Sequence, residues 1–257
     1  SEGTNDAGRF DVGTGGGWIE GGGYTLTKLG PAPAAFRGPV SNLAALVVSN
    51  GLVYAEDNDL AIGTNVVVYP GGRIGGYNGR VLGPAVRLEG GALIGFAAAS
   101  RWTNTLTAAT DSYIINDATV AGYLAGDIIL AGPIGGPGRL TKLSGSTTYL
   151  RAPVTNEGGW VVNGGTLTLD SMLVSTGGVT ISNGTFLVGS YGVTSAIALS
   201  ADVTVDNGRE LRWNNALPLV FTNSILGNGL VRREDVTGRL EWRGTNTMDF
   251  LAVGSEA

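Results

Sequence analysis

The sequence of 257 residues contains no cysteine and no histidine. Without them the chain has no thiolate nucleophile, no Ser-His-Asp triad and no ordinary zinc site. Any catalysis would rest on carboxylates, Arg, Lys, Tyr or a cation bound through oxygen atoms. We therefore expect no catalytic, cofactor-binding or metal-binding residues and a protein that is not an enzyme. The absence of cysteine also fits a chain that crosses an oxidising compartment unfolded, and we expect a secreted or cell-surface location.

Charged side chains are scarce as well. They make up 14% of the chain, and 16 Lys and Arg against 21 Asp and Glu leave a net charge of -5. An acidic protein has no electrostatic attraction for a polyanion, so the composition predicts no nucleic acid partner. Hydrophobic residues reach 43%, which is too many for a disordered polyelectrolyte.

Long hydrophobic runs are also missing. The longest apolar stretch, residues 119–134, contains Asp127 and Pro133 and falls short of the roughly 20 uninterrupted residues that a membrane-spanning helix needs. The sequence therefore predicts no membrane insertion of this chain. It begins with Ser1 and shows no targeting segment, so we expect a processed chain or a piece of a longer one.

Glycine, in contrast, is abundant. The 44 glycines are about one residue in six, against a usual share of roughly 7%. They separate short segments rich in Val, Ile, Leu, Thr and Tyr, which is typical of strands, and helical periodicity is nearly absent. The clearest of these segments are 24–29, 46–54, 66–74, 161–169, 179–187 and 203–211.

The dipeptide Asn-Gly occurs six times, and the last four copies, which begin at 163, 183, 207 and 228, are 20, 24 and 21 residues apart. Asn-Gly is the strongest signal for an antiparallel hairpin. A nearly constant period, however, favours a solenoid in which the same turn recurs at the same corner of each coil. We expect structural turns at Gly51, Gly164, Gly184 and Gly208, the last three at equivalent corners with positive φ.

A longer repeat overlies the short one. Residues 24–30 match residues 138–145, and the tetrapeptide Leu-Thr-Lys-Leu begins at both Leu26 and Leu140. Lys28 and Lys142, which are the two lysines of the chain, therefore fall at equivalent repeat positions. A third copy, residues 227–233, carries Arg where the others carry Lys.

The segment from Ile134 to Leu143, continued by residues 158–167, resembles the autotransporter-associated β-strand repeat, and residues 240–247 match the middle of that repeat. The imperfect copies lie around residues 22–54, 134–169 and 225–247. The resemblance implies a right-handed parallel β-helix of the kind found in bacterial secreted or surface proteins, often as the stalk of a passenger domain.

The expected fold is a single all-β domain over residues 1–257, a right-handed parallel β-helix of roughly ten or more coils at about 20 residues per coil. Val, Ile and Leu are expected to fill the interior, while Thr, Asn and Ser lie at the corners and outer faces. We expect the polar, glycine-rich segment 1–17 to be a cap or a linking strand.

Two charged clusters are candidate sites. The run Glu56-Asp57-Asn58-Asp59 has the oxygen ligands that Ca²⁺ prefers, but it lacks the glycine pattern of a calcium-binding repeat, and a solvated turn is favoured. Residues 232–235 combine arginine with Glu234 and Asp235. Glycoside hydrolysis needs two carboxylates across a groove, and the sequence shows no such series on successive coils, so surface ion pairs are favoured.

Among the five tryptophans, Trp213 and Trp242 have charged neighbours. We expect these two side chains to face outward and to be the first candidates for contact with a glycan, while core packing is the alternative interpretation.

The sequence therefore predicts a non-catalytic extracellular structural module, a stalk or scaffold, that associates with itself end to end and assembles into filaments. One alternative is a glycan-binding surface adhesin, which would expose aromatic side chains in line along one face. Another is a carbohydrate-active enzyme, which would gather carboxylates in a groove.

Overall fold

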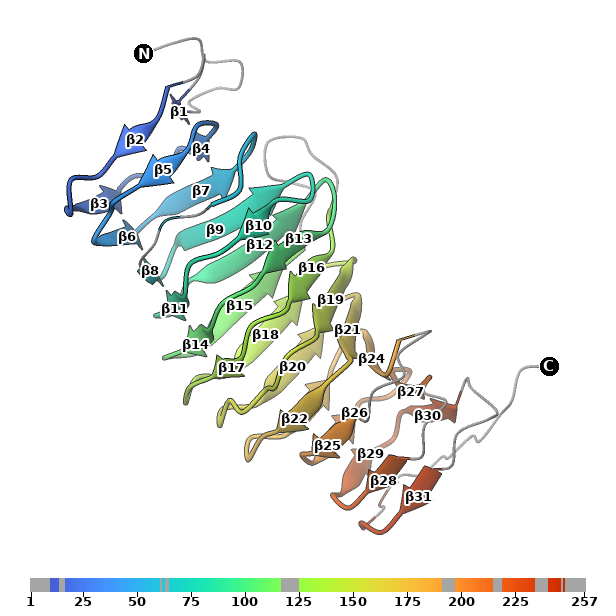
Figure 1. Cartoon of the computed structure of the whole chain (residues 1–257). Coiled ribbons are helices and arrows are strands. Elements are labelled where there is room, and N and C mark those ends of the chain that lie inside the picture. Colours follow the sequence, from blue (N-terminus) through green and yellow to red (C-terminus); the bar gives the residue numbers. More distant parts are fainter. Residues whose placement is uncertain are drawn as a thin grey trace.

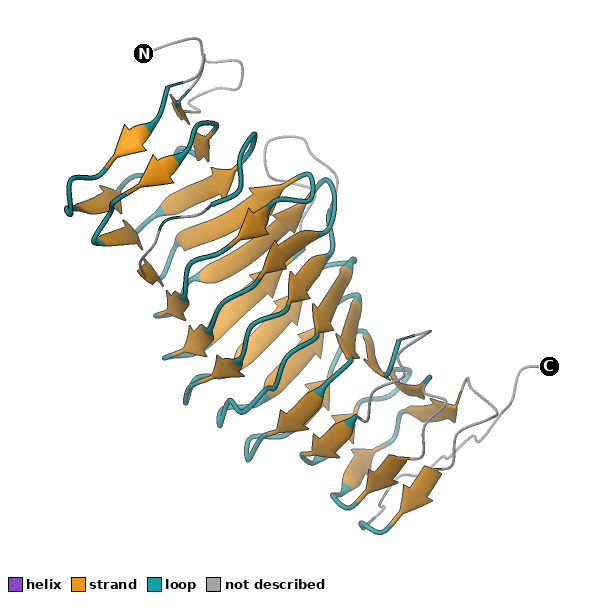
Figure 2. Ribbon diagram, viewed as in Figure 1, coloured by secondary structure: helices purple, strands orange, loops and turns teal. Residues whose placement is uncertain are grey.

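The computed structural model describes residues 10–13, 17–60, 62, 65–116, 125–190, 197–214, 219–233, 240–245 and 247. Throughout these residues the chain forms short strands joined by turns, with no helix (Figure 2). The strands stack in parallel along an elongated rod, from β1 at the N-terminal end to β31 at the other end (Figure 1). The expected all-β, parallel β-helix is therefore confirmed.

Each coil contributes strands to as many as three faces of the rod, which we call the first, second and third face in the order the chain meets them. The first face is an 11-stranded sheet. Its strands are β1 (Phe10–Val12), β4 (Ala34–Phe36), β7 (Gly51–Ala55), β9 (Gly72–Tyr77), β12 (Ala92–Phe96), β15 (Ser112–Ile115), β18 (Leu140–Leu143), β20 (Trp160–Asn163), β23 (Val179–Ile181), β26 (Val203–Val205) and β29 (Ile225–Gly227).

The second face follows the first in each coil, although the coil between β7 and β8 contributes to it an isolated bridge from Leu60 to Leu82 and not a strand. Near the N-terminus it is a pair of strands, and further along it is an 8-stranded sheet. Its strands are β2 (Ile19–Glu20), β5 (Val40–Ser41), β10 (Val81–Leu82), β13 (Ser100–Trp102), β16 (Ile128–Leu130), β19 (Thr147–Leu150), β21 (Thr166–Leu169), β24 (Thr185–Val188), β27 (Glu210–Trp213) and β30 (Leu230–Arg233).

The third face closes each coil and leads to the first face of the next one. It comprises a 6-stranded sheet and two pairs of strands. Its strands are β3 (Thr25–Lys28), β6 (Ala45–Val48), β8 (Asn65–Val68), β11 (Val86–Leu88), β14 (Leu106–Ala108), β17 (Ile134–Gly135), β22 (Met172–Val174), β25 (Ala198–Ser200), β28 (Leu219–Phe221) and β31 (Leu240–Trp242).

The Asn-Gly turns lie where a solenoid requires them. Five of the six join the first face to the second, at 78–79, 163–164, 183–184, 207–208 and 228–229, whereas Asn50-Gly51 joins the third face to the first. The named strands that flank these turns pair in parallel with the neighbouring coils and not with each other. The prediction that one turn recurs at one corner is therefore confirmed, and the hairpin interpretation is wrong.

Positive φ was expected at Gly164, Gly184 and Gly208, and this holds for Gly164 (φ 143) and Gly208 (φ 69) but not for Gly184. The turn glycine Gly51 also has positive φ (75). The strand register places Gly184 against Gly165 of the preceding coil. A Cβ at Gly184 would lie 2.6 Å from the carbonyl oxygen of Gly165. Residue 184 is therefore glycine because two coils approach closely there, and not because of its own φ.

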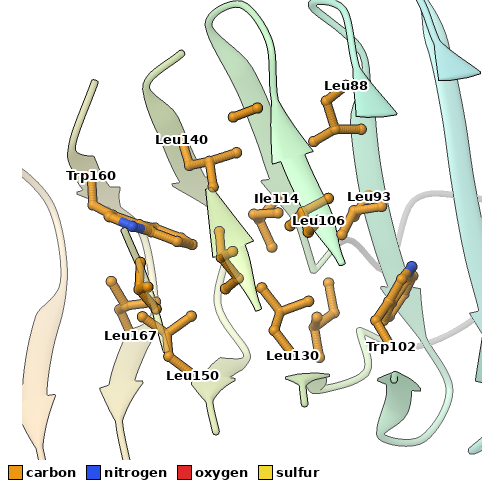
Figure 3. Packing of buried hydrophobic residues seen from close by; sticks show 14 of the residues in the cluster. Leu88, Leu93, Trp102, Leu106, Ile114, Leu130, Leu140, Leu150, Trp160 and Leu167 are labelled. Atoms are coloured by element: carbon orange, nitrogen blue, oxygen red, sulfur yellow. The ribbon is translucent and has the colours of Figure 1, made fainter. Parts of the chain in front are cut away.

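The interior of the rod is one apolar cluster that runs from Ala34 to Val231. Strand alternation explains it, because every second residue points inward. Register then aligns the inward residues of successive coils, as it places Leu140 beside Trp160, and Figure 3 shows these side chains in layers. Close packing between the inward side chains of successive coils stabilises the rod, more than any single residue does.

A second apolar cluster lies outside this core, on the outer side of the first face. It consists of Ala35, Leu52, Tyr54, Ile94 and Phe96, all of them buried. The rings of Tyr54 and Phe96 meet edge to face, with centroids 5.2 Å apart, although their strands are separated by β9. Gly75 of β9 leaves room for them, since a Cβ there would lie 3.2 Å from Phe96.

Candidate functional site

The N-terminal coil, which comprises β1, β2 and β3, presents strand edges at one end of the rod. Each of these strands pairs on one side only, with β4, β5 and β6 respectively, among the described residues. An unpaired strand edge offers backbone N–H and C=O groups to another strand. Within the part of the chain that the structure describes, the first coil therefore presents one such edge on each of the three faces.

The same coil also exposes large apolar side chains. Trp18, Tyr24 and Leu29 are 72%, 77% and 71% exposed, while the other exposed large hydrophobic residues of the described chain lie between 38% and 44%. Exposed apolar groups that gather in one place are typical of interaction surfaces. The concentration at one end of the rod is therefore informative, although a single exposed residue would not be.

An apolar cavity of about 220 Å³ lies inside this end of the rod. Val12, Ile19 and Leu26 from the first coil contact the core but remain half-buried. In the interior coils the corresponding inward residues have neighbours in both directions along the rod. The remaining lining residues are Thr27, Lys28, Ala34, Phe36, Leu46 and Val53.

The C-terminal coil continues the same three faces through β29, β30 and β31, which pair with β26, β27 and β28. On its other side β29 is hydrogen-bonded as well, because the Ile225 N–H donates to the carbonyl oxygen of Thr245 and the Thr247 N–H donates to that of Ile225. Among the described residues, β30 and β31 are therefore the strands with an open edge at this end. Its interior differs from that of the first coil. Register places Arg233 beside Trp213, in an inward column that Leu130, Leu150 and Leu169 occupy earlier. A charged group thus stands where the previous coils carry apolar side chains.

Opposite charges lie on the second face at the two ends. Glu20 of β2 is exposed, and a hydrogen bond from the Ser41 hydroxyl (2.8 Å) lowers the pKa of its carboxyl group, which is therefore ionised at neutral pH. At the other end β30 carries Arg232 and Arg233. The first strand of this face therefore carries an acidic side chain, and the last one carries basic side chains.

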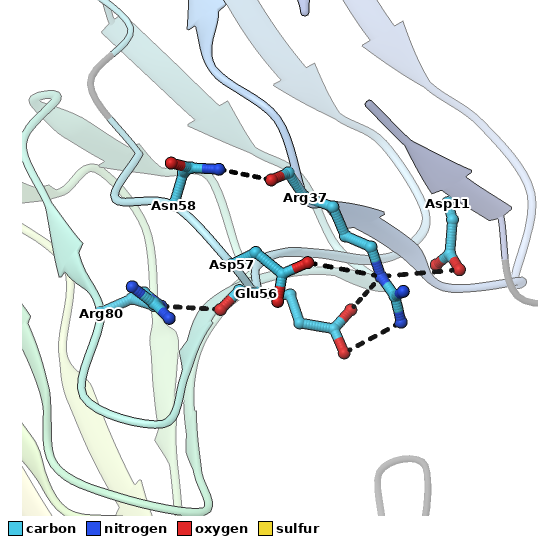
Figure 4. A network of polar contacts seen from close by, with 6 residues as sticks. All are labelled: Asp11, Arg37, Glu56, Asp57, Asn58 and Arg80. Carbon is cyan, nitrogen blue, oxygen red and sulfur yellow. Dashed lines mark hydrogen bonds and ion pairs between the residues drawn. The ribbon is translucent and has the colours of Figure 1, made fainter. Parts of the chain in front are cut away.

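The acidic run after β7 belongs to a network that ties the first coils together (Figure 4). The Arg37 guanidinium donates two hydrogen bonds to the Glu56 carboxylate, at 3.0 and 3.3 Å. It also lies 3.6 Å from Asp11 and 3.9 Å from Asp57. The Arg80 side chain donates to the carbonyl oxygen of Glu56 at 2.7 Å.

The rest of this run is bonded as well. The Asn58 amide donates to the carbonyl oxygen of Arg37, and Asp59 accepts a hydrogen bond from the Val81 N–H at 2.8 Å. Within the described chain, no group of three or more Asp, Glu, His or Cys residues is placed to hold a metal ion. The carboxylates of this run thus join successive coils. Glu234 and Asp235 of the other charged cluster lie outside the described residues.

Trp213 does not face outward, so that expectation was wrong. It is 3% exposed and belongs to the core cluster. In β27 the inward residues are Leu211 and Trp213, while Glu210 and Arg212 are half-buried on the outer side, so the charged neighbours of Trp213 point away from it. The indole ring instead meets Phe221 edge to face, with centroids 6.2 Å apart. The side chain of Trp242 lies outside the described residues.

No protein-family model, curated protein or solved structure matches this chain. No helix in the described residues is long and apolar enough to span a membrane. The site therefore has to be interpreted from its own geometry. Sequence reasoning anticipated open ends but not the exposed residues of the first coil, because nothing in the repeat distinguishes an end coil from an interior one.

Proposed function

We propose that this chain is a non-catalytic extracellular structural module, a β-helical stalk or scaffold, that associates end to end with other copies of itself. The observation that supports this most is the correspondence between the two ends. Among the described residues the first coil offers β1, β2 and β3 on the three faces. At the other end β30 and β31 offer edges on the second and third faces, and residues 245 and 247, which are hydrogen-bonded to Ile225 of β29, continue the first face. A second copy stacked in line would extend every sheet.

Such a contact joins two different surfaces, so it does not close on itself and generates a filament. The exposed Trp18, Tyr24 and Leu29 supply apolar area for burial at this contact. Glu20 of one copy and Arg232 of the next lie on the same face and steer the correct orientation. Arg233 is compatible with such a contact, because the aliphatic stem of an arginine packs against apolar surface.

The extracellular location is part of the same proposal. It is supported by the absence of cysteine, by the repeated coils, and by the resemblance of residues 134–167 to the autotransporter-associated repeat. In this proposal the rod serves as a spacer that holds other parts of a bacterial surface protein away from the cell.

Light scattering during gel filtration, at increasing loading concentration, tests the association. We expect the average mass of the wild-type protein to rise with concentration, and we expect Tyr24→Asp/Leu29→Asp to remain a monomer. Both side chains are more than 70% exposed, so this variant keeps its fold, which circular dichroism verifies.

The matched control is Met172→Asp/Val174→Asp, which places the same charges at two exposed apolar positions on the side of the rod. This variant is expected to associate like the wild type. A wild-type protein that stays monomeric at every concentration would overturn the proposal, and so would a control that loses association as fully as the first-coil variant.

A further inference from the structure

A shallow hollow of about 320 Å³ lies on the side of the rod, remote from both ends. Its lining includes Ala92 and glycines of two successive corners, and Ala92 itself is buried. Arg73 and Tyr113 stand on either side of Ala92, and Ile115 forms an apolar wall. The glycines that line it are Gly71, Gly72, Gly90 and Gly91.

The strand register produces this arrangement. Arg73, Ala92 and Tyr113 are in register on three adjacent strands, β9, β12 and β15. The residues that follow them, Ile74, Leu93 and Ile114, are completely buried in the core. Alternation therefore directs Arg73, Ala92 and Tyr113 to the outer side of the first face.

Arg73 and Tyr113 lie two strands apart, which on a sheet is roughly 10 Å. Ala92 between them is buried, at 3% exposure, so a ligand would lie over the two flanking side chains and not against Ala92. A carboxylate bound by the planar fork of Arg73 would leave the rest of the same ligand on the side of Tyr113.

The charges around the hollow favour an anionic ligand. The neighbouring carboxylates are neutralised, since Glu89 is paired with Arg87 and Asp111 with Arg139, the latter at 2.9 Å. Arg73, in contrast, has no side-chain hydrogen bond or ion pair with any other described residue. Its planar fork of donors matches a carboxylate, and Tyr113 is 42% exposed and presents an aromatic face.

We infer that this hollow binds one residue of an acidic polysaccharide, with the carboxylate of a uronic acid on Arg73 and its sugar ring on Tyr113. This inference goes beyond the structural role and does not depend on it, because the hollow lies on the side of the rod and remains accessible in both the monomer and the filament. It differs from the glycan contact expected at Trp213, which is buried.

The test is calorimetric or fluorescence titration with a uronic acid oligosaccharide and with its carboxyl-reduced, neutral counterpart. We expect the acidic oligosaccharide to bind and the neutral one to bind at least tenfold more weakly. We also expect Arg73→Gln to weaken binding at least tenfold, as the loss of a charged hydrogen bond does. Tyr113→Leu should weaken it by about two- to tenfold, as the loss of a stacking contact does.

Matched controls are available on the same rod. Arg101 is exposed, lies on the second face and makes no side-chain ion pair in the described chain, and Tyr69 is 44% exposed. Arg101→Gln and Tyr69→Leu should leave binding unchanged. The inference is overturned if the wild type fails to bind the acidic oligosaccharide at millimolar concentration, if it binds the neutral form equally well, or if Arg101→Gln weakens binding as much as Arg73→Gln.

Discussion

The tetrapeptide Leu-Thr-Lys-Leu occurs in the first coil, in β3 and the residue after it, and again in β18 near the middle of the rod. Both lysines use the same hydrogen bonds. Lys28 donates to the carbonyl oxygens of Gly30 and Asn50, at 2.6 and 3.2 Å. Lys142 donates to those of Ser144 and Gly164, both at 2.9 Å. Each lysine thus joins its own turn to the turn 22 residues further on.

The surroundings of the two copies differ. β18 lies on the first face between β15 and β20, and both Leu140 and Lys142 are completely buried. β3 lies on the third face at the end of the rod, where Leu26 and Lys28 are half-buried and Leu29 is exposed. The same local sequence therefore forms the same local contacts, and the neighbouring coil decides how much of it is buried. Among the described residues, the first coil has the structure of an interior coil with a neighbouring coil on one side only.

The largest expected difference between the two copies concerns their leucines. Leu140→Ala should lower the free energy of unfolding by about 2–5 kcal/mol, because it leaves a cavity between packed coils. Leu26→Ala removes the same atoms next to a cavity that already exists, and we expect a cost of about 1 kcal/mol. Urea unfolding of both variants measures the difference, and equal costs would contradict the idea that the first coil is incompletely packed.

The second expected difference between the two copies concerns how the free energy of unfolding depends on pH. Burial lowers the pKa of Lys142 to about 8, while the Asp127 carboxylate opposes this shift. In the unfolded chain the pKa is about 10.4, so between these values the unfolded state binds more protons and stability rises with pH. The rise should total about 3 kcal/mol between pH 8 and pH 10.4. Below pH 8 both states are charged and Lys142 contributes no slope.

Comparison with Lys142→Met isolates this effect, because other titrating groups are common to both proteins. Lys142→Met should lack the rise in stability between pH 8 and pH 10.4. Lys28→Met should change the pH dependence of stability less. Burial lowers the pKa of Lys28 too, but its half-exposed ammonium remains solvated. Urea midpoints measured from pH 7 to pH 10.5 test the assignment, and identical slopes for the wild type and Lys142→Met would refute it.

The smallest expected effect concerns backbone strain at glycines of the corner between the first and second faces. At Gly208, with φ 69, an added Cβ would meet no atom within 4 Å, so Gly208→Ala should cost about 1–2 kcal/mol through backbone strain alone. Gly145 also has open space for a Cβ and no positive φ, so Gly145→Ala should change thermal stability very little. A Gly208 variant as stable as the Gly145 variant would rule out the strain.

Much of this architecture follows from sequence patterns. The period of the Asn-Gly turns predicted coils and not hairpins, because only parallel stacking returns one turn to one corner. Alternation in Glu210-Leu211-Arg212-Trp213 was a signal that Trp213 points inward with Leu211, and the charged neighbours obscured it. The same rule directs Lys142 inward together with Leu140. Nothing in the sequence, however, shows that the carbonyl oxygens of Ser144 and Gly164 accept hydrogen bonds from its ammonium group.

Other features depend on register between coils of unequal length, which no local pattern specifies. Arg73, Ala92 and Tyr113 are 19 and 21 residues apart, yet they align on adjacent strands. The outer apolar cluster of Tyr54 and Phe96 requires Gly75 to lie between them, which again depends on register. The hollow beside Arg73 and this cluster were therefore beyond the reach of sequence reasoning.

The proposal that the incomplete first coil receives the last coil of another copy is tested most directly by electron microscopy of rods that carry one label. The chain contains no cysteine, so Arg101→Cys provides a single attachment point that is nearer to one end than to the other. We expect concentrated samples to contain straight filaments in which labels recur at an even spacing of one chain length, as head-to-tail stacking requires. Rods of a single chain length at every concentration, or labels in alternating close and distant pairs, would contradict the proposal.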